Sequence, residues 1–143
     1  MKRIKHIFIV FIVLTSSITF AQVKFEAKVS KTKLGQNERL RIDFIMNKDG
    51  DNFESPDFEN FQVIGGPNTQ VSNSWLNGAH SYAKTYSYFL APQKQGRFTI
   101  KSASIEIEGV IYKTKAVTVQ VTNAVKRPND PYNVEATASE NIH

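Results

Sequence analysis

Histidine is the side chain of this sequence best suited to acid–base chemistry near neutral pH, and one histidine is a candidate for it. His6 lies in the N-terminal segment, just before its apolar run, and His143 is the last residue, which leaves His80. A catalytic base must be oriented by a carboxylate and must reach a nucleophile. Ser74 and Ser81 lie near His80, but no nucleophile-elbow or triad motif accompanies them. We therefore interpret His80 as a partly exposed residue of a strand pair, and we expect no catalytic residue.

Oxygen ligands gather in one segment, where Asn47, Asp49, Gly50 and Asp51 could in principle hold calcium. The spacing does not match an EF-hand loop, and no glutamate occupies the later position of the bidentate ligand. These residue types also favour turns, so we predict a solvated loop over residues 47–52. The chain has no cysteine, which excludes disulfides, thiolate catalysis and sulfur-ligated metal. No phosphate-binding glycine motif is present, and we expect neither a cofactor nor a metal.

The N-terminal segment is typical of a secretory signal peptide. Lys2, Arg3 and Lys5 precede an apolar run over residues 7–14, and small residues in Thr19-Phe20-Ala21 predict cleavage before Gln22. The alternative, an uncleaved anchor helix, is disfavoured because the run is far shorter than about 20 residues. Three of the 18 Lys and Arg residues lie in this segment and none of the 13 acids does, which leaves a net charge of +2. That balance gives no indication of nucleic-acid binding.

The elements that would position His80 form one predicted hairpin over residues 61–90. Asn77-Gly78 is the strongest short-range signal for a two-residue type I′ turn. The turn fixes the register, in which these residues face each other: Leu76 and Ala79, Trp75 and His80, Asn73 and Tyr82, Val71 and Lys84, Thr69 and Tyr86. One face then carries Trp75, Tyr82 and Tyr86. The opposite face carries small polar residues, namely Ser72, Ser74, Ser81, Ala83 and Thr85.

The aromatic residues leave two interpretations of this hairpin. Four phenylalanines lie at alternating positions and are expected in the core: Phe25, Phe44, Phe61 and Phe98. For Trp75, Tyr82 and Tyr86 we favour core packing, because large aromatic side chains of small domains are usually buried. Alternatively, they are exposed anchors for a protein partner, since Trp and Tyr dominate binding hot spots. The candidate partner-contact hairpin therefore comprises Trp75, Asn77, Gly78, His80, Tyr82 and Tyr86.

The remaining pattern predicts an all-β fold. Apolar and polar residues alternate over residues 23–29 and 39–46, a short strand covers residues 61–64, and Gly65-Gly66-Pro67 is expected to turn the chain into the hairpin. Pro92 should end the hairpin, because it cannot donate to a ladder. Further strands, with a tight turn at Glu108-Gly109, lie within residues 97–122. About eight short strands without a helix predict an antiparallel Ig-like or fibronectin-like β-sandwich lacking the disulfide, over residues 22–122.

The composition changes at residue 123, and residues 123–143 are interpreted as a linker that could enter a second domain. We expect the sequence to be the front end of a longer protein.

Six short segments follow one another along the chain, namely NFESPDFENF (residues 52–61), VIGGP (63–67), the Asn77-Gly78 turn, YSYFLAP (86–92), GRFTI (96–100) and VTVQV (117–121). In this order and spacing, residues 23 to about 122 resemble the N-terminal domain of the BatD family, the oxygen-tolerance or aerotolerance proteins of Bacteroidetes and other bacteria. The resemblance implies tandem Ig-like extracytoplasmic domains, with a membrane helix much further along the chain. It also implies work beside von Willebrand factor A domain and tetratricopeptide-repeat proteins of the Bat system, and it implies no catalytic residues.

Our leading hypothesis is a non-enzymatic, periplasmic interaction module whose sheet edges and Trp75 hairpin contact protein partners. The alternative is a carbohydrate-binding or adhesin-like sandwich that uses the aromatic face of the hairpin as a platform. An exposed Trp75 ringed by Asp, Asn or Arg would favour the alternative, and a buried Trp75 would exclude it.

Overall fold

The computed structural model describes residues 21–126, which form ten strands and no helix. The predicted signal peptide, apart from Ala21, and the predicted linker beyond Lys126 lie outside the described residues. The strands are β1 (Phe25–Val29), β2 (Lys33–Gly35), β3 (Leu40–Met46), β4 (Asp51–Glu54), β5 (Phe61–Leu76), β6 (Ala79–Pro92), β7 (Gly96–Ile100), β8 (Ser104–Ile107), β9 (Val110–Lys113) and β10 (Val117–Thr122).

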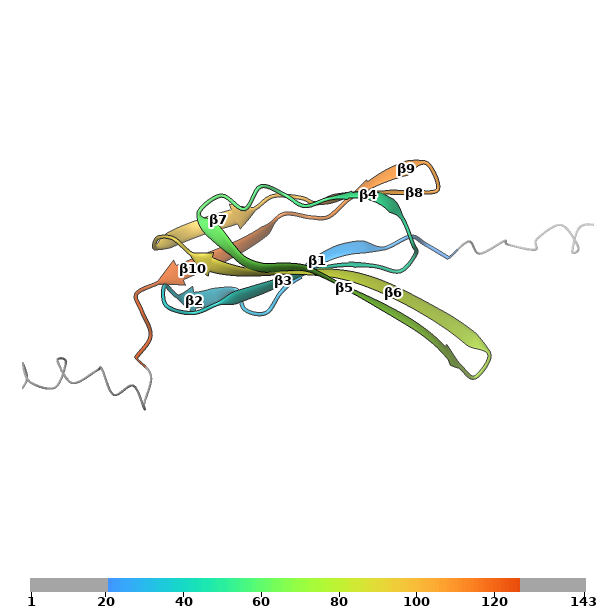
Figure 1. Ribbon diagram of the computed structural model, residues 1–143, viewed down its shortest axis with the longest axis horizontal. Helices are drawn as coiled ribbons and strands as arrows, with labels where there is room; N and C mark the ends of the chain where they lie inside the picture. Colours follow the sequence, from blue (N-terminus) through green and yellow to red (C-terminus); the bar gives the residue numbers. More distant parts are fainter. Residues whose placement is uncertain (1–20, 127–143) are drawn as a thin grey trace, which may run out of the picture.

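The described strands form three sheets, and one of them has immunoglobulin-type order. Its sequence of neighbours, β1-β3-β6-β5, is the A-B-E-D order of such a sandwich when β4 is taken as strand C. The other two sheets have the orders β2-β10-β7 and β4-β8-β9. Figure 1 shows β7, β4 and β8 above the four-stranded sheet. All pairs are antiparallel except β2 with β10, which is parallel. The predicted Ig-like all-β fold without a disulfide is confirmed.

Strand β3 shows how the sequence pattern produces the core. Leu40, Ile42, Phe44 and Met46 are completely buried, while the residues between them are wholly or partly exposed. The Phe44 ring lies 5.7 Å from the ring of Phe53 and 6.0 Å from that of Tyr88, so it joins the two layers. The alternation of period two therefore directs one face of the sheet into the core.

The four phenylalanines predicted in the core behave similarly. Phe25, Phe44 and Phe61 are buried, and Phe98 is half-buried with its ring 6.0 Å from that of Phe61.

Two short strands were not predicted. Lys33–Gly35 forms β2 because it pairs in parallel with β10. The loop predicted over residues 47–52 ends early, since β4 begins at Asp51 and pairs with β8. Both short strands form by pairing with a strand that lies much later in the sequence, so the local composition does not reveal them.

The prediction that Gly65-Gly66-Pro67 turns the chain is wrong. Strand β5 continues through these residues to Leu76, and its pairing with β6 shifts between Val63 and Gly65 and again between Gly65 and Asn68. The Gly66–Pro67 peptide bond is cis. Gly66 has a φ of 93°, and a Cβ there would clash with the carbonyl oxygen of Ser87 on β6. Glycine thus permits a bulge in a continuous strand rather than a turn.

The two predicted tight turns are confirmed. Asn77 and Gly78 have φ values of 51° and 79°, and Glu108 and Gly109 have values of 51° and 77°. Consecutive positive φ angles are those of a type I′ turn. The β5–β6 hairpin extends beyond the other strands and is the most prominent projection of the described residues (Figure 1).

Candidate functional site

The candidate site is the projecting part of the β5–β6 hairpin. All five predicted pairs are present, from Leu76 opposite Ala79 to Thr69 opposite Tyr86. The same alternation places Tyr82, Tyr86 and Tyr88 on one face of β6. Tyr88 is buried in the core, Tyr86 and Tyr82 are half-buried, and His80 is exposed. The aromatic face of the hairpin is therefore a continuation of the core face of the sheet. It extends beyond the second layer of strands that covers that face.

Strand β4 covers the core face of the hairpin at its base. The ring of Phe53 stacks on Tyr86 with centroids 4.1 Å apart and 11° between the planes. The ammonium group of Lys84 lies 5.5 Å from the centroid of the same tyrosine ring. Tyr86 is thus fixed between the core and the projecting segment.

The next cover along the hairpin is an ion pair. Lys84 Nζ donates to Asp49 Oδ1 at 2.9 Å, from a side chain that is 18% exposed. The hydrogen bond from Lys84 holds the pKa of Asp49 below its ordinary value, and the same bond raises the pKa of Lys84. Partial burial, together with the negative charge of Asp49, raises the pKa of Tyr82. The segment considered for calcium thus uses its carboxylate to hold a lysine.

At the tip the aromatic side chains have no such cover. Trp75 and Leu76 are each 73% exposed. The Trp75 ring lies 4.5 Å from the ring of His80 at an angle of 37°, and His80 Nε2 donates to the side-chain oxygen of Asn73. The expectation that Trp75 packs in the core is therefore wrong, because the second layer ends before the hairpin does. The alternative interpretation required an exposed Trp75, and the structure shows that exposure.

The histidine has no catalytic geometry around it. Ser74 and Ser81 face each other on the opposite side of the hairpin, with 2.6 Å between their hydroxyl oxygens. Their hydroxyls therefore point away from His80, whose ring contacts are Trp75 and Asn73. Within residues 21–126 there is also no group of three His, Asp or Glu side chains that could hold a metal ion.

A further property of the hairpin escaped the sequence-based reasoning. No Lys, Arg, Asp or Glu occurs from residue 60 to residue 83, although 22% of the whole chain is charged. This uncharged segment lies between Glu59 and Lys84, so it covers all of β5, the turn and the first residues of β6. The signal was present in the sequence, but its meaning depends on knowing that this stretch projects.

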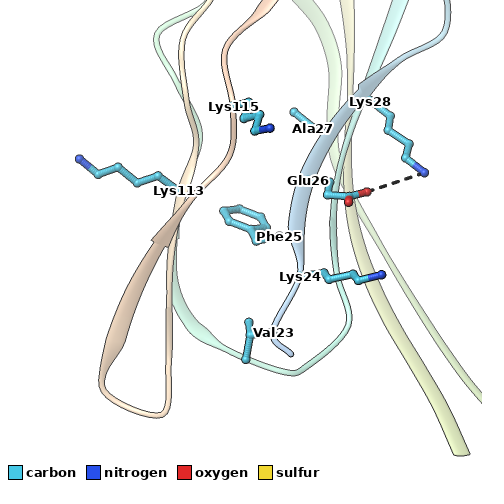
Figure 2. Close-up of a pocket in the computed structure, with 8 residues that line it drawn as sticks. All are labelled: Val23, Lys24, Phe25, Glu26, Ala27, Lys28, Lys113 and Lys115. Atoms are coloured by element: carbon cyan, nitrogen blue, oxygen red, sulfur yellow. Dashed lines mark ion pairs between the residues drawn. The ribbon is translucent and has the colours of Figure 1, made fainter. Parts of the chain in front are cut away.

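Open hollows also occur on the described surface, and two of them lie along β1 and beside the hairpin. The first, of about 400 Å³, runs along β1 beside Lys113 and Lys115. Figure 2 shows Phe25 at its centre, while the side chains of Lys113 and Lys28 point away from each other. Lys28 lies 3.9 Å from Glu26. The lysines thus do not converge on a common ligand.

The second hollow, of about 410 Å³, lies beside the outer part of the hairpin, between Asn47, Asp49, His80 and Tyr82. Its polar groups are largely engaged. The Asn47 side chain accepts from the backbone of Lys24 and donates to the carbonyl of Gln22, and Asp49 is paired with Lys84.

Comparison with known proteins identifies the family. The family model described as the BatD DUF11-like domain matches residues 27–121. The chain belongs to the BatD family. The match begins within β1 and ends within β10, so it covers nearly all of the β-sandwich, including the projecting hairpin. No curated protein matches the chain. BatD proteins form an extracytoplasmic, membrane-associated family of aerotolerance proteins.

Residues 21–126 of this BatD chain contain no helix long and apolar enough to cross a membrane.

Proposed function

We propose that this BatD domain is a non-enzymatic protein-interaction module of the periplasm, and that the tip of the β5–β6 hairpin is its contact surface. The observation that carries the proposal is the 73% exposure of Trp75 on a projecting hairpin. Exposing a tryptophan to water is unfavourable unless a partner covers it, and tryptophan is the residue most enriched at binding hot spots.

The surroundings of Trp75 support this role. Its ring is held by His80, and Tyr86 on the same face is fixed by Phe53. A side chain that is already ordered loses less conformational entropy on binding. The hairpin therefore presents a preorganised aromatic edge rather than a flexible loop.

The partners that we propose are extracytoplasmic von Willebrand factor A domain proteins of the Bat system, together with its tetratricopeptide-repeat proteins. The support for this step is membership of the BatD family, because the resemblance to that family implies work beside such proteins. The absence of charge over residues 60–83 suits a contact made by aromatic and backbone groups rather than by salt bridges.

Binding to a purified von Willebrand factor A domain from the same Bat system tests the proposal. The chain from Gln22 onward is immobilised and the dissociation constant is measured by biolayer interferometry. We expect Trp75→Ala to weaken binding roughly 30-fold, which corresponds to a hot spot of about 2 kcal/mol. Ile111→Ala is the matched control, because Ile111 is 67% exposed on β9. Equal affinity of the Trp75 variant and the wild type would refute the role of the hairpin.

A carbohydrate-binding platform is the second candidate, and the hollow beside Tyr82 is the observation that favours it. Aromatic rings next to Asn47 and Asp49 resemble the groups that bind sugars, although both polar side chains already have partners. A glycan array with the wild-type chain separates the two candidates. Binding that is lost in Tyr82→Ala but kept in Trp75→Ala would favour the platform.

A further inference from the structure

The edges of the described sheets differ in a way that indicates a specific partner. The edge strands are β1 and β5, β2 and β7, and β4 and β9. Five of them carry at least one charged residue, whereas β5, the longest at 16 residues, carries none. In natural sheets, charged residues, especially lysine, protect the free edge strands against pairing with another chain. The edge of β5 lacks this protection.

The backbone of β5 defines what this edge offers. Leu76 and Ala79 close the two-residue turn and therefore form a hydrogen-bonded pair with each other. Because the pattern alternates, the N–H and C=O groups of Thr69, Val71, Asn73 and Trp75 point away from β6. Among the described residues no strand lies on that side of β5. A regular row of free donors and acceptors thus extends from the bulge to the tip.

We propose that this row pairs with the same row of a second copy of the chain, antiparallel, so that two four-stranded sheets join into one. The two-fold axis passes through Asn73, which faces Asn73 of the second copy. In this register Trp75 of each copy lies opposite Val71 of the other. Aromatic and β-branched residues directly opposite each other form a stabilising cross-strand pair.

Three features favour a second copy as the occupant. An uncharged strand is complementary to itself, and the register covers both Trp75 and Val71, which are 73% and 55% exposed. The His80 ring donates to the Asn73 oxygen, which leaves the Asn73 amide group to bond to its symmetry mate. The hairpin projects past the other strands (Figure 1), so the tip of one hairpin can lie beside the base of the hairpin of the second copy. The Asn77-Gly78 turns remain free at the two ends.

Cross-linking tests the contact directly, because the chain has no cysteine of its own. Hydrogen-bonded antiparallel residues have Cα atoms about 5.5 Å apart, within the range that a disulfide spans. We expect Asn73→Cys to give a covalent dimer under mild oxidation, in the chain from Gln22 onward. Ile111→Cys on the β9 edge is the control and should remain a monomer. Ser72→Cys and Ser74→Cys should cross-link when mixed but not alone, because residue 72 faces residue 74 of the other copy.

Sedimentation velocity supplies an independent measurement on chains without cysteine. The wild type should pass from monomer to dimer as its concentration rises. Val71→Glu should remain a monomer, because it brings a charge to the edge that would pair. Within its own hairpin the new carboxylate faces Lys84. Ile111→Glu should dimerise like the wild type. Circular dichroism confirms that the variants are folded.

A wild type that stays monomeric at hundreds of micromolar, with no cross-link at Asn73 above the Ile111→Cys level, would overturn the proposal. So would vesicle binding by a chain that remains monomeric, because the uncharged tip would then serve a lipid surface. None of these measurements involves a Bat-system partner, so their outcome is separate from that of the proposed function.

Discussion

Tyr86 stacks on Phe53 at 4.1 Å, and this contact is the last stacking of aromatic rings between the two layers along the hairpin. On the core side of it Tyr88 is buried, and on the outer side the same face of β6 passes through half-buried Tyr82 to exposed His80. The stack therefore joins the stability of the sandwich to the orientation of the projecting tip.

Loss of the stack should destabilise the whole fold. We expect Phe53→Ala to lower the free energy of unfolding by about 2 kcal/mol, less than a fully buried phenylalanine because Phe53 is half-buried. A double-mutant cycle with Tyr86→Ala should give a coupling energy of about 0.5–1.5 kcal/mol. Urea unfolding measures both values. Trp75→Ala serves as the control and should change stability by no more than about 0.5 kcal/mol. Additive effects at Phe53 and Tyr86 would contradict the structural role of the stack.

The hairpin also shows how far the sequence determines the candidate site. A two-residue turn at Asn77-Gly78 fixes every later pair by counting, and for that reason the register could be predicted. The exposure of Trp75 could not, because it depends on where β4 and the segment around Asp49 end relative to the hairpin. That is a property of tertiary packing, and no local pattern around Trp75 encodes it.

The same limit explains the errors in the fold. Gly65-Gly66-Pro67 has the composition of a turn, and only the neighbouring strand β6 shows that it is a bulge. Short strands such as β2 owe their existence to a distant partner, here β10. In contrast, the alternation in β3 predicted its buried face, because one face of a sheet must be apolar when it packs on a second layer.

The bulge gives a sharp prediction from two adjacent glycines. Gly66→Ala should destabilise the protein by about 2 kcal/mol or more, since its φ of 93° is strained for alanine and the new Cβ would meet the Ser87 carbonyl. Gly65→Ala is the matched control. A Cβ at Gly65 would lie 3.5 Å from the Phe89 ring, an ordinary contact, so we expect a change within about 1 kcal/mol. Thermal or urea unfolding of the two variants checks the difference, and similar stabilities would show that the bulge is not required.

The ion pair between Lys84 and Asp49 predicts a pH dependence with a definite sign. The pKa of Asp49 is lowered, so its contribution is present above the ordinary value of 3.8 and is lost as the pH falls through the folded-state pKa. The pKa of Lys84 is raised, so its contribution is present below 10.5 and is lost as the pH rises through the higher folded-state value. The pair should therefore stabilise the fold throughout the range between these limits.

Asp49→Asn tests this dependence. The variant should be less stable than the wild type near neutral pH by up to about 1 kcal/mol, because the pair is accessible to solvent. The difference should shrink only as the pH falls below 3.8 and through the lower folded-state pKa of Asp49, where the wild-type carboxylate becomes protonated. Asp57→Asn is the control, since Asp57 is exposed and belongs to no ion pair among the described residues. Urea unfolding over a pH series gives the measurement, and a difference that grows on acidification would have the wrong sign.

The fluorescence of Trp75 reports directly on the tip of the hairpin, because it is the only tryptophan of the chain. At high dilution we expect red-shifted emission that acrylamide quenches efficiently, as the 73% exposure requires. If β5 pairs with a second copy, the emission should shift to the blue and quenching should weaken as the concentration rises. Val71→Glu should keep the dilute spectrum at every concentration. A blue-shifted, protected signal that is independent of concentration would instead place Trp75 inside the fold, and would remove the basis for a contact at the hairpin tip.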